Sequence, residues 1–318
     1  MYKPFLYIIL LLISIGSSKA QNLVYNGDFE IYDTCPTNGS TPGDLQIERC
    51  TGWTAPTKLG TSDYFNACSI NFINSVPQNF FGYQQPKNGN GYCGFYAWVI
   101  HTDTENSYRE YIQTELAQPL ITGKKYQFSF FVSFSGYNYA VEKIGALFTA
   151  NDLNANTFSP IVATPQVVNT NGIITDSVGW TKIEGEFIAN GGEKFLTIGY
   201  FEDSLAVFDT LNTDPLFMSP ESYYYVDGVE LIEIETEIII PNIFTPNNDN
   251  NNDLFYLNFS FEKVEIFNRW GNKVFESVNN DSYWHGRTTS GSEMPHGTYY
   301  YIITTKKKKN KGFIQLLR

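Results

Sequence analysis

The sequence is poor in the residues that most enzymes use for catalysis. Its 318 residues include only three histidines and four cysteines, and it has no GxSxG, HExxH or P-loop motif. Nucleophilic and acid–base catalysis normally require a poised histidine, a cysteine or a pair of acids. We therefore expect a non-catalytic protein. A glycosidase needs only two carboxylates, such as Glu110 with Glu115 or Glu184 with Glu186, so a hydrolase remains the alternative.

Positive charge is also scarce. The net charge is −12, and it divides into +2 for residues 1–20, −17 for residues 21–238 and +3 for residues 239–318. An acidic body repels phosphate backbones and anionic membranes. We expect no nucleic-acid partner, while the acidity by itself identifies no ligand.

Long apolar runs are absent after the first twenty residues. Phe5 to Ile15 form an apolar run behind Lys3, and Ser18-Lys19-Ala20 resembles a cleavage site before Gln21. This order is typical of a secretory signal peptide, and the run is short for a bilayer span. We predict a signal peptide at 1–20 and no integral membrane segment after its cleavage, with an uncleaved anchor as the alternative.

The four cysteines, Cys35, Cys50, Cys68 and Cys93, all lie in the N-terminal third. In an exported protein, an even and clustered set predicts two disulfides. Of the three possible pairings we favour Cys35–Cys50 with Cys68–Cys93, because each closes a short loop. Zinc is a weaker interpretation, since no CxxC pair is present.

Strand patterns dominate the chain, and no amphipathic helix is evident. Residues 126–134 alternate so that five apolar side chains share one face, which is the pattern of a half-buried strand. Similar runs, separated by turn residues, continue to residue 234. Shorter strand-like runs follow between residues 264 and 317. The length exceeds one typical core. We predict an all-β protein with a β-sandwich at 21–235, a connector at 236–240 and a small Ig-like sandwich at 241–318.

The C-terminal domain carries a specific signature. In chain order the signature contains Pro241 to Asn247 with Asp249 and Asp253, then Val264-Glu-Ile-Phe-Asn-Arg269-Trp270-Gly271, Trp284-His-Gly286, Pro295-His-Gly297 and Arg318. Residues 241–318 resemble the gliding-motility-associated C-terminal domain of Bacteroidota, the type B sorting signal of the type IX secretion system.

This resemblance implies the compartment and one partner. It implies export across the outer membrane to the cell surface or medium, with the type IX secretion machinery as partner. We expect Phe267, Trp270 and Trp284 to serve the core. Arg269 and Arg318 are candidate recognition charges, with a structural role as the alternative.

The N-terminal body resembles another family less sharply. Asn22-Leu-Val-Tyr-Asn-Gly-Asp-Phe-Glu30 with Gly52-Trp53, residues 111–130 and Tyr225-Val-Asp-Gly-Val-Glu-Leu231 are similar to jelly-roll carbohydrate-binding modules of families 4 and 22. In that family a structural calcium joins the first and last strands. The matching positions are the backbone carbonyl of Asp28 and the carboxylates of Glu30 and Asp227, so the resemblance implies Ca²⁺ there, with ordinary turn chemistry as the alternative.

Glycan binding requires exposed aromatic rings that stack on sugars, with polar neighbours for the hydroxyl groups. The candidates lie in the most aromatic stretches of the body; they are Tyr83, Tyr96, Trp98, Arg109, Tyr137 and Tyr139. The alternative for each is buried packing. We predict a surface or secreted protein whose jelly roll binds polysaccharide or matrix without catalysis; the alternatives are a polysaccharide-acting hydrolase and a purely structural surface protein.

Overall fold

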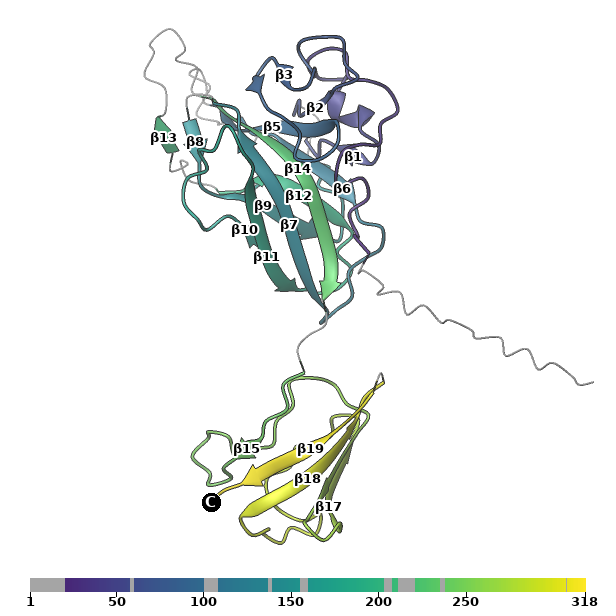
Figure 1. Ribbon diagram of the computed structural model, residues 1–318, viewed down its shortest axis with the longest axis vertical. Helices are drawn as coiled ribbons and strands as arrows, with labels where there is room; N and C mark the ends of the chain where they lie inside the picture. The colour runs from purple at the N-terminus through teal and green to yellow at the C-terminus, as the bar shows by residue number, and fades with distance from the viewer. Residues whose placement is uncertain are drawn as a thin grey trace, which may run out of the picture. The chain divides into compact units, whose positions relative to one another are not determined.

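The computed structural model describes residues 21–57, 60–99, 108–136, 139–154, 160–202, 208–210, 221–234, 238–306 and 308–318. The expected signal peptide lies outside these residues. The chain divides into two compact units, with the boundary between Glu235 and Thr236 (Figure 1). The described residues contain strands and one 3₁₀ turn, η1 (Gln46–Arg49), which confirms the all-β prediction. None of them forms a helix with the length and apolar character needed to cross a membrane.

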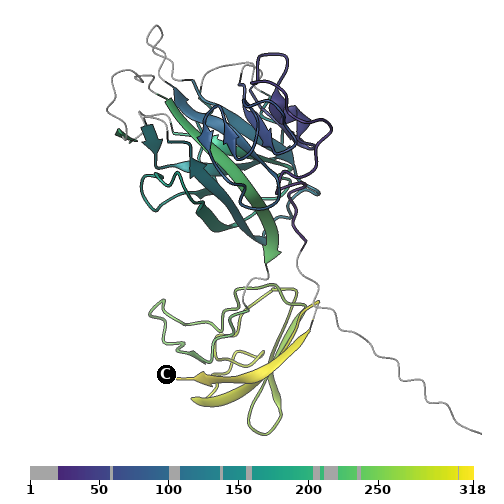
Figure 2. The same cartoon turned by 45° about the horizontal axis from the view of Figure 1, so that its top comes forward.

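Two five-stranded sheets form the N-terminal unit. The first runs in the order β1 (Trp53–Thr54), β6 (Tyr111–Glu115), β12 (Phe195–Tyr200), β9 (Ile144–Thr149), β10 (Val167–Val168). The second runs β11 (Thr181–Ile188), β7 (Lys125–Phe134), β14 (Glu221–Ile234), β5 (Gly91–Val99), β2 (Asp63–Asn66). Two short pairs complete the unit: β3 (Gln78–Asn79) with β4 (Gly82–Tyr83), and β8 (Tyr139–Val141) with β13 (Phe208–Thr210). The long strand β14, green in Figures 1 and 2, is the middle strand of the second sheet. The arrangement is the predicted jelly-roll β-sandwich.

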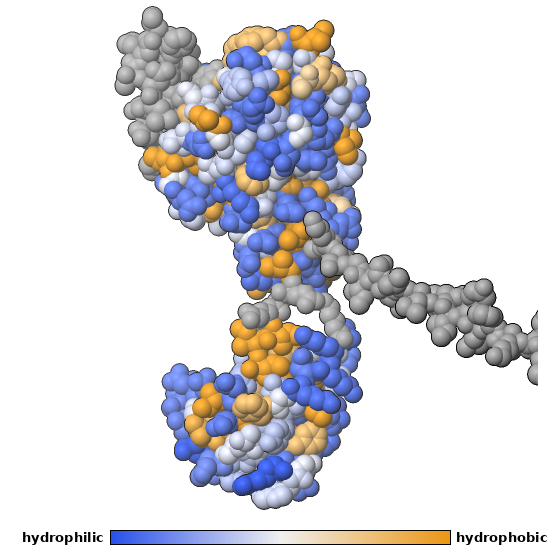
Figure 3. Space-filling model, viewed as in Figure 1, coloured by the Kyte–Doolittle hydropathy of each residue, from blue (hydrophilic) through white to orange (hydrophobic). Residues whose placement is uncertain are grey.

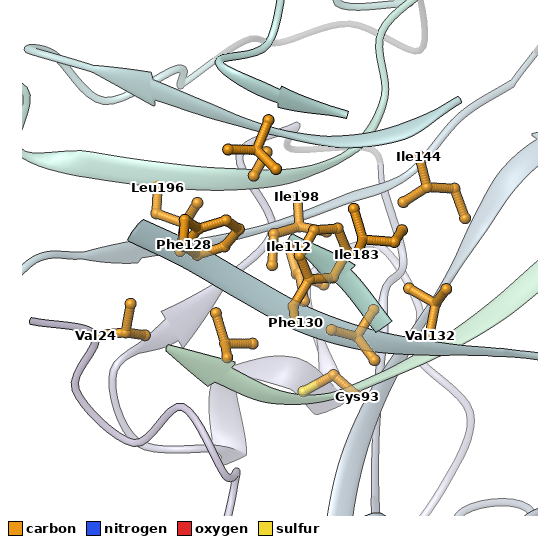
Figure 4. Close-up of a cluster of buried hydrophobic side chains, with 14 of the residues drawn as sticks. Val24, Cys93, Ile112, Phe128, Phe130, Val132, Ile144, Ile183, Leu196 and Ile198 are labelled. Atoms are coloured by element: carbon orange, nitrogen blue, oxygen red, sulfur yellow. The ribbon is translucent and has the colours of Figure 1, made fainter. Parts of the chain in front are cut away.

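Strand β7 shows how the sequence pattern produces the core. Phe128, Phe130, Val132 and Phe134 alternate along it and are at most 1 % exposed. They point to the same face, where side chains from both sheets meet in one cluster (Figure 4). Burying each such side chain contributes about 1.5–3 kcal/mol. The expected turn before the strand is present, with Gly123 at φ +74°.

The opposite face of the second sheet is covered by residues 67–90, here called the cap segment, which join β2 to β5. Phe81 of the cap segment stacks on Tyr223 of β14 with ring centroids 3.7 Å apart. Asn79 accepts a hydrogen bond from the hydroxyl of Tyr225 at 2.9 Å. A second aromatic cluster is therefore buried between the sheet and the protein's own chain.

The disulfide differs from the favoured pairing. Cys35 is bonded to Cys68, because the turn that follows β2 packs against the N-terminal loop. Cys50 and Cys93 are thiols in the core, each 0 % exposed. They are hydrogen-bond partners, and burial together with Cys50 raises the pKa of the Cys93 thiol well above its ordinary value. Closeness in sequence was a poor guide to pairing here.

The C-terminal unit contains one five-stranded sheet in the order β15 (Ile243–Phe244), β19 (Lys309–Leu316), β18 (Gly297–Thr304), β16 (Lys263–Phe267), β17 (Lys273–Val278). Strand β15 is parallel to β19, and the other neighbours are antiparallel. The second layer consists of the segments around Phe255 and Trp284, joined by an isolated bridge. Both side chains belong to the separate core of this unit.

Candidate ligand-binding surface

Two of the predicted glycan contacts are buried. Trp98 is 1 % exposed and Arg109 is 2 % exposed, so neither side chain faces a ligand, contrary to the prediction. The Arg109 guanidinium lies over the ring of Tyr200 at 4.6 Å and donates to the carbonyl of Glu202. The sequence did not reveal this burial, because the residues that contact Trp98 and Arg109, such as Tyr139 and Tyr200, come from distant parts of the chain.

The other candidates differ in exposure. Tyr96 and Tyr139 are half-buried; the Tyr96 ring is 5.0 Å from that of Tyr223, and the Tyr139 ring is 6.4 Å from that of Trp98. Tyr137 lies outside the described residues. Tyr83 alone among the described candidates has an exposed side chain, at 58 %.

Tyr83 belongs to a small surface that the sequence did not indicate. The side-chain amide of Gln85 donates to the Tyr83 hydroxyl at 2.8 Å, and the Gln85 carbonyl accepts the indole N–H of Trp180 at 3.0 Å. The half-buried Trp180 ring packs edge-on against Tyr92 at 5.9 Å. Lys87, on the same loop as Gln85, lies over the Phe131 ring at 4.6 Å. We call Tyr83, Gln85 and Trp180 the Tyr83 surface.

Two of the residues matched to a calcium site, Glu30 and Asp227, lie close enough to influence each other's charge. Asp227 is 0 % exposed and Glu30 is half-buried, and the Glu30 charge contributes to raising the pKa of Asp227. Burial is the largest cause of that shift, which brings the pKa of Asp227 to about 7.

The oxygens of these two carboxylates already accept N–H donors. Glu30 accepts the backbone N–H groups of Asn90 and Gly91 at 2.7 and 2.9 Å. One Asp227 oxygen accepts two further backbone N–H groups of the cap segment, and the other accepts the N–H of Gly228. Calcium needs oxygen ligands with free lone pairs. The donor set as arranged does not fit a calcium ion, and the two acids instead hold the end of the cap segment against the sandwich.

A second pair of acids, Asp63 and Glu110, is also buried in the N-terminal unit. Glu110 is 0 % exposed and accepts from Thr61, from the Tyr108 hydroxyl and from the Tyr96 backbone N–H. Asp63 accepts from Tyr223 and from a backbone N–H. Burial raises the pKa of Asp63 to about 7, and the Glu110 charge adds to the effect.

The acids considered for a glycosidase have structural partners. Glu110 is saturated by the donors just described, and Glu115 pairs with Lys194 at 2.7 Å. Glu184 pairs with Lys182 at 2.6 Å, and Glu186 pairs with Lys125 at 2.5 Å, on the exposed face of β11. These arrangements are those of packing and surface ion pairs.

In the C-terminal unit, the two signature tryptophans have opposite environments. Trp284 is 0 % exposed and its indole N–H donates to a backbone carbonyl, in agreement with the prediction. Trp270 is 72 % exposed, which corrects its expected place in the core. It lies in the tight turn between β16 and β17, where Gly271 has φ +82° and the ring cannot reach the sheet.

The remaining signature residues shape loops. Asp249 and Asp253 accept backbone N–H groups of the Asn-rich loop. Gly286 and Gly297 have φ of +74° and +147°. Arg318 donates to the Gly286 carbonyl at 2.9 Å.

Comparison with known families identifies the C-terminal unit. Residues 238–316 match the CHU_C type IX secretion signal domain. The resemblance in the sequence is thereby confirmed, and the protein is exported across the outer membrane to the cell surface or the extracellular space. No curated protein matches the chain.

Several solved structures are similar to the chain at low identity. The CBM22-1–GH10 modules of xylanase 10B from Clostridium thermocellum, complexed with xylohexaose, are 13 % identical with a TM-score of 0.30; the match covers 67 % of this chain and 33 % of the xylanase. The K1 cleaved adhesin domain of Lys-gingipain from Porphyromonas gingivalis is 18 % identical with a TM-score of 0.29, covering 58 % and 92 %. The adhesin domain of Epf from Streptococcus pyogenes is 10 % identical with a TM-score of 0.30, covering 81 % and 92 %. Similarity at this level does not assign a ligand.

Proposed function

We propose that the N-terminal unit binds polysaccharide or glycosylated matrix outside the cell, without catalysis, and that the secretion signal domain delivers it there. The observation that carries this proposal is the Tyr83 surface, where an exposed ring and a half-buried indole are both hydrogen-bonded to Gln85. Aromatic faces stack on the C–H faces of sugar rings, and amides bond their hydroxyl groups.

The Tyr83 surface is held in place before any ligand arrives. Gln85 bonds both to the Tyr83 hydroxyl and, through its carbonyl, to Trp180. The strand pair β3–β4 that carries Tyr83 is anchored beneath by Asn79, which is 1 % exposed. A surface ordered in advance loses less conformational entropy on binding, which favours affinity from few contacts.

Charge narrows the class of glycan. Residues 21–238 carry a net charge of −17. Uronic-acid or sulfated polysaccharides are repelled by such a body at low ionic strength, whereas neutral polysaccharides are not. We therefore favour neutral glycans.

Affinity electrophoresis of the mature chain in gels that contain neutral or acidic polysaccharides tests the proposal. Tyr83→Ala is expected to abolish retardation by the polysaccharide that binds the wild type. Phe72→Ala is a matched control, because Phe72 is on the same cap segment and is also 58 % exposed. Equal loss in both variants, or no retardation of the wild type by any polysaccharide in the panel, would contradict the proposal. Release of new reducing ends would favour the hydrolase instead.

A further inference from the structure

The signature residues of the secretion signal domain are spread over the sequence but gather at one end of its sheet. Phe244 at the end of β15 pairs with Leu316 at the end of β19, and Leu316 also pairs with Gly297 at the start of β18. Phe267 at the end of β16 pairs with Tyr300 of β18. Four connections therefore leave the sheet at the same end: those after β15, between β16 and β17, before β18 and after β19. We call this side the signature end; the Lys-rich turn between β18 and β19 is at the opposite end.

The signature end contains a cavity of about 340 Å³. It is lined by residues of three of these connections, those after β15, before β18 and after β19, including Asn247, Asp253, His285, Arg287 and Arg318. Its walls are fixed: Asp253 accepts the backbone N–H groups of two Asn residues with positive φ, and Arg318 bonds to the carbonyl of Gly286. Gly286 has φ +74°, and a Cβ there would lie 2.8 Å from Leu316 and 3.0 Å from Pro246, so any other residue would disturb this wall of the cavity.

The turn between β16 and β17 presents an indole to solvent. The side chain of Asn268 accepts the backbone N–H groups of Trp270 and Asn272, each at 3.0 Å, so the backbone of the turn is clamped. The Trp270 ring is nevertheless 72 % exposed, and the Arg269 guanidinium lies over it at 4.8 Å. An apolar side chain this exposed has no role in the core of its own domain, and it stands on a turn whose backbone is clamped.

The arginines at this end differ in their ion pairs. Arg287 and Arg318 share the carboxylate of Glu293, at 2.6 and 3.2 Å. Within the described part of the chain, no carboxylate pairs with Arg269, whose contact is the Trp270 ring. The turn therefore offers a positive charge and an indole side by side, both accessible to a partner.

We propose that the signature end is the surface that docks on the type IX secretion machinery, with Arg269 and Trp270 as its main contacts. The partner is a protein component of that machinery that presents a carboxylate beside an apolar pocket. The carboxylate pairs with Arg269, and the pocket receives the indole. Tryptophan and arginine are the residues that most often dominate protein interfaces, and a rigid turn supplies them without an ordering cost.

Secretion of the full-length protein in a host with an intact type IX apparatus tests this surface. Trp270→Ala and Arg269→Glu are each expected to reduce the extracellular amount about tenfold or more, with the protein retained in the periplasm. Arg269→Lys keeps the charge and is expected to retain most of the export. Phe313→Ala is the matched control, because Phe313 is 53 % exposed on β19, which β18 separates from β16 and its turn.

Folding is followed separately by the melting temperature of the purified variants. Because both turn side chains are accessible, Trp270→Ala is expected to melt within about 2 °C of the wild type. Normal export of Trp270→Ala, or an equal export loss in Phe313→Ala, would overturn the proposal. Loss of export together with a large fall in melting temperature would also overturn it, because the turn would then serve stability. Glycan binding by purified protein does not depend on this result, so the two proposals fail independently.

Discussion

Replacing Asp63 by asparagine is expected to stabilise the N-terminal unit at alkaline pH. Burial and the Glu110 charge raise the pKa of Asp63 from 3.8 to about 7 in the folded protein. The folded state therefore binds this proton more tightly than the unfolded chain does. The contribution of Asp63 to the free energy of unfolding is therefore largest below the unfolded pKa, and it is lost as the pH rises from about 4 to about 7.

The size of the effect follows from the shift. One pKa unit corresponds to about 1.4 kcal/mol, so ionised Asp63 lowers the free energy of unfolding by at most roughly 4 kcal/mol above pH 7. We expect a value of about 2–4 kcal/mol. Asparagine avoids the buried charge and keeps both contacts. In the wild type, the Ser40 N–H and the Tyr223 hydroxyl both donate to the Asp63 carboxylate. In the variant, the side-chain carbonyl accepts the Ser40 N–H, and the side-chain NH₂ donates to the Tyr223 oxygen after the hydroxyl rotates.

Chemical denaturation of the wild type and of Asp63→Asn at pH 5 and pH 8 measures this difference. We expect a gain of about 2–4 kcal/mol in the unfolding free energy of the variant at pH 8, and a much smaller one at pH 5. Asp28→Asn, at an exposed acid of the same unit, is the control and is expected to change neither value. A variant that is less stable than the wild type at pH 8 would refute the reasoning, as would a wild type with equal stability at both pH values.

Three further predictions concern the buried groups. The thiols of Cys50 and Cys93 are in contact, and exported proteins are oxidised by thiol–disulfide exchange catalysts, so we expect these two cysteines to form a second disulfide after export. Alkylation of the denatured secreted protein is then expected to find no free thiol, and two labelled cysteines per chain would contradict this. Because N–H donors occupy Glu30 and Asp227, calcium or a chelator is expected to shift the melting temperature by less than about 1 °C, and a clear rise with calcium would restore the expectation from the resemblance. Trp284→Ala removes a fully buried side chain and is expected to destabilise the C-terminal unit by about 3–5 kcal/mol in denaturant unfolding, whereas an unchanged transition would exclude its role in the core.

The candidate site was predicted only in part, and the reasons are local. Tyr83 was identified because aromatic residues are dense around it, but Gln85 and Trp180 are 95 positions apart and meet only in the folded unit. Trp98 and Arg109 lie in equally aromatic sequence and are buried, since composition does not say which face of a strand another segment will cover. Glu30 and Asp227, the acids matched to a calcium site, lie close together, yet most of the N–H groups that they accept come from the cap segment.

The class of fold and the export signal could both be predicted before the structure was known. The alternation of Phe128, Phe130 and Val132 requires a strand with one buried face, because side chains on a strand point alternately to its two sides. The secretion signal domain was recognisable because its turns depend on particular residues, such as Gly271 and Gly286, whose positive φ other residues rarely adopt. Tertiary structure alone decided the pairing of Cys35 with Cys68, the burial of Arg109 and the exposure of Trp270. These features depend on which distant segments pack together. A periodic pattern along one strand does not predict which other segments will contact it.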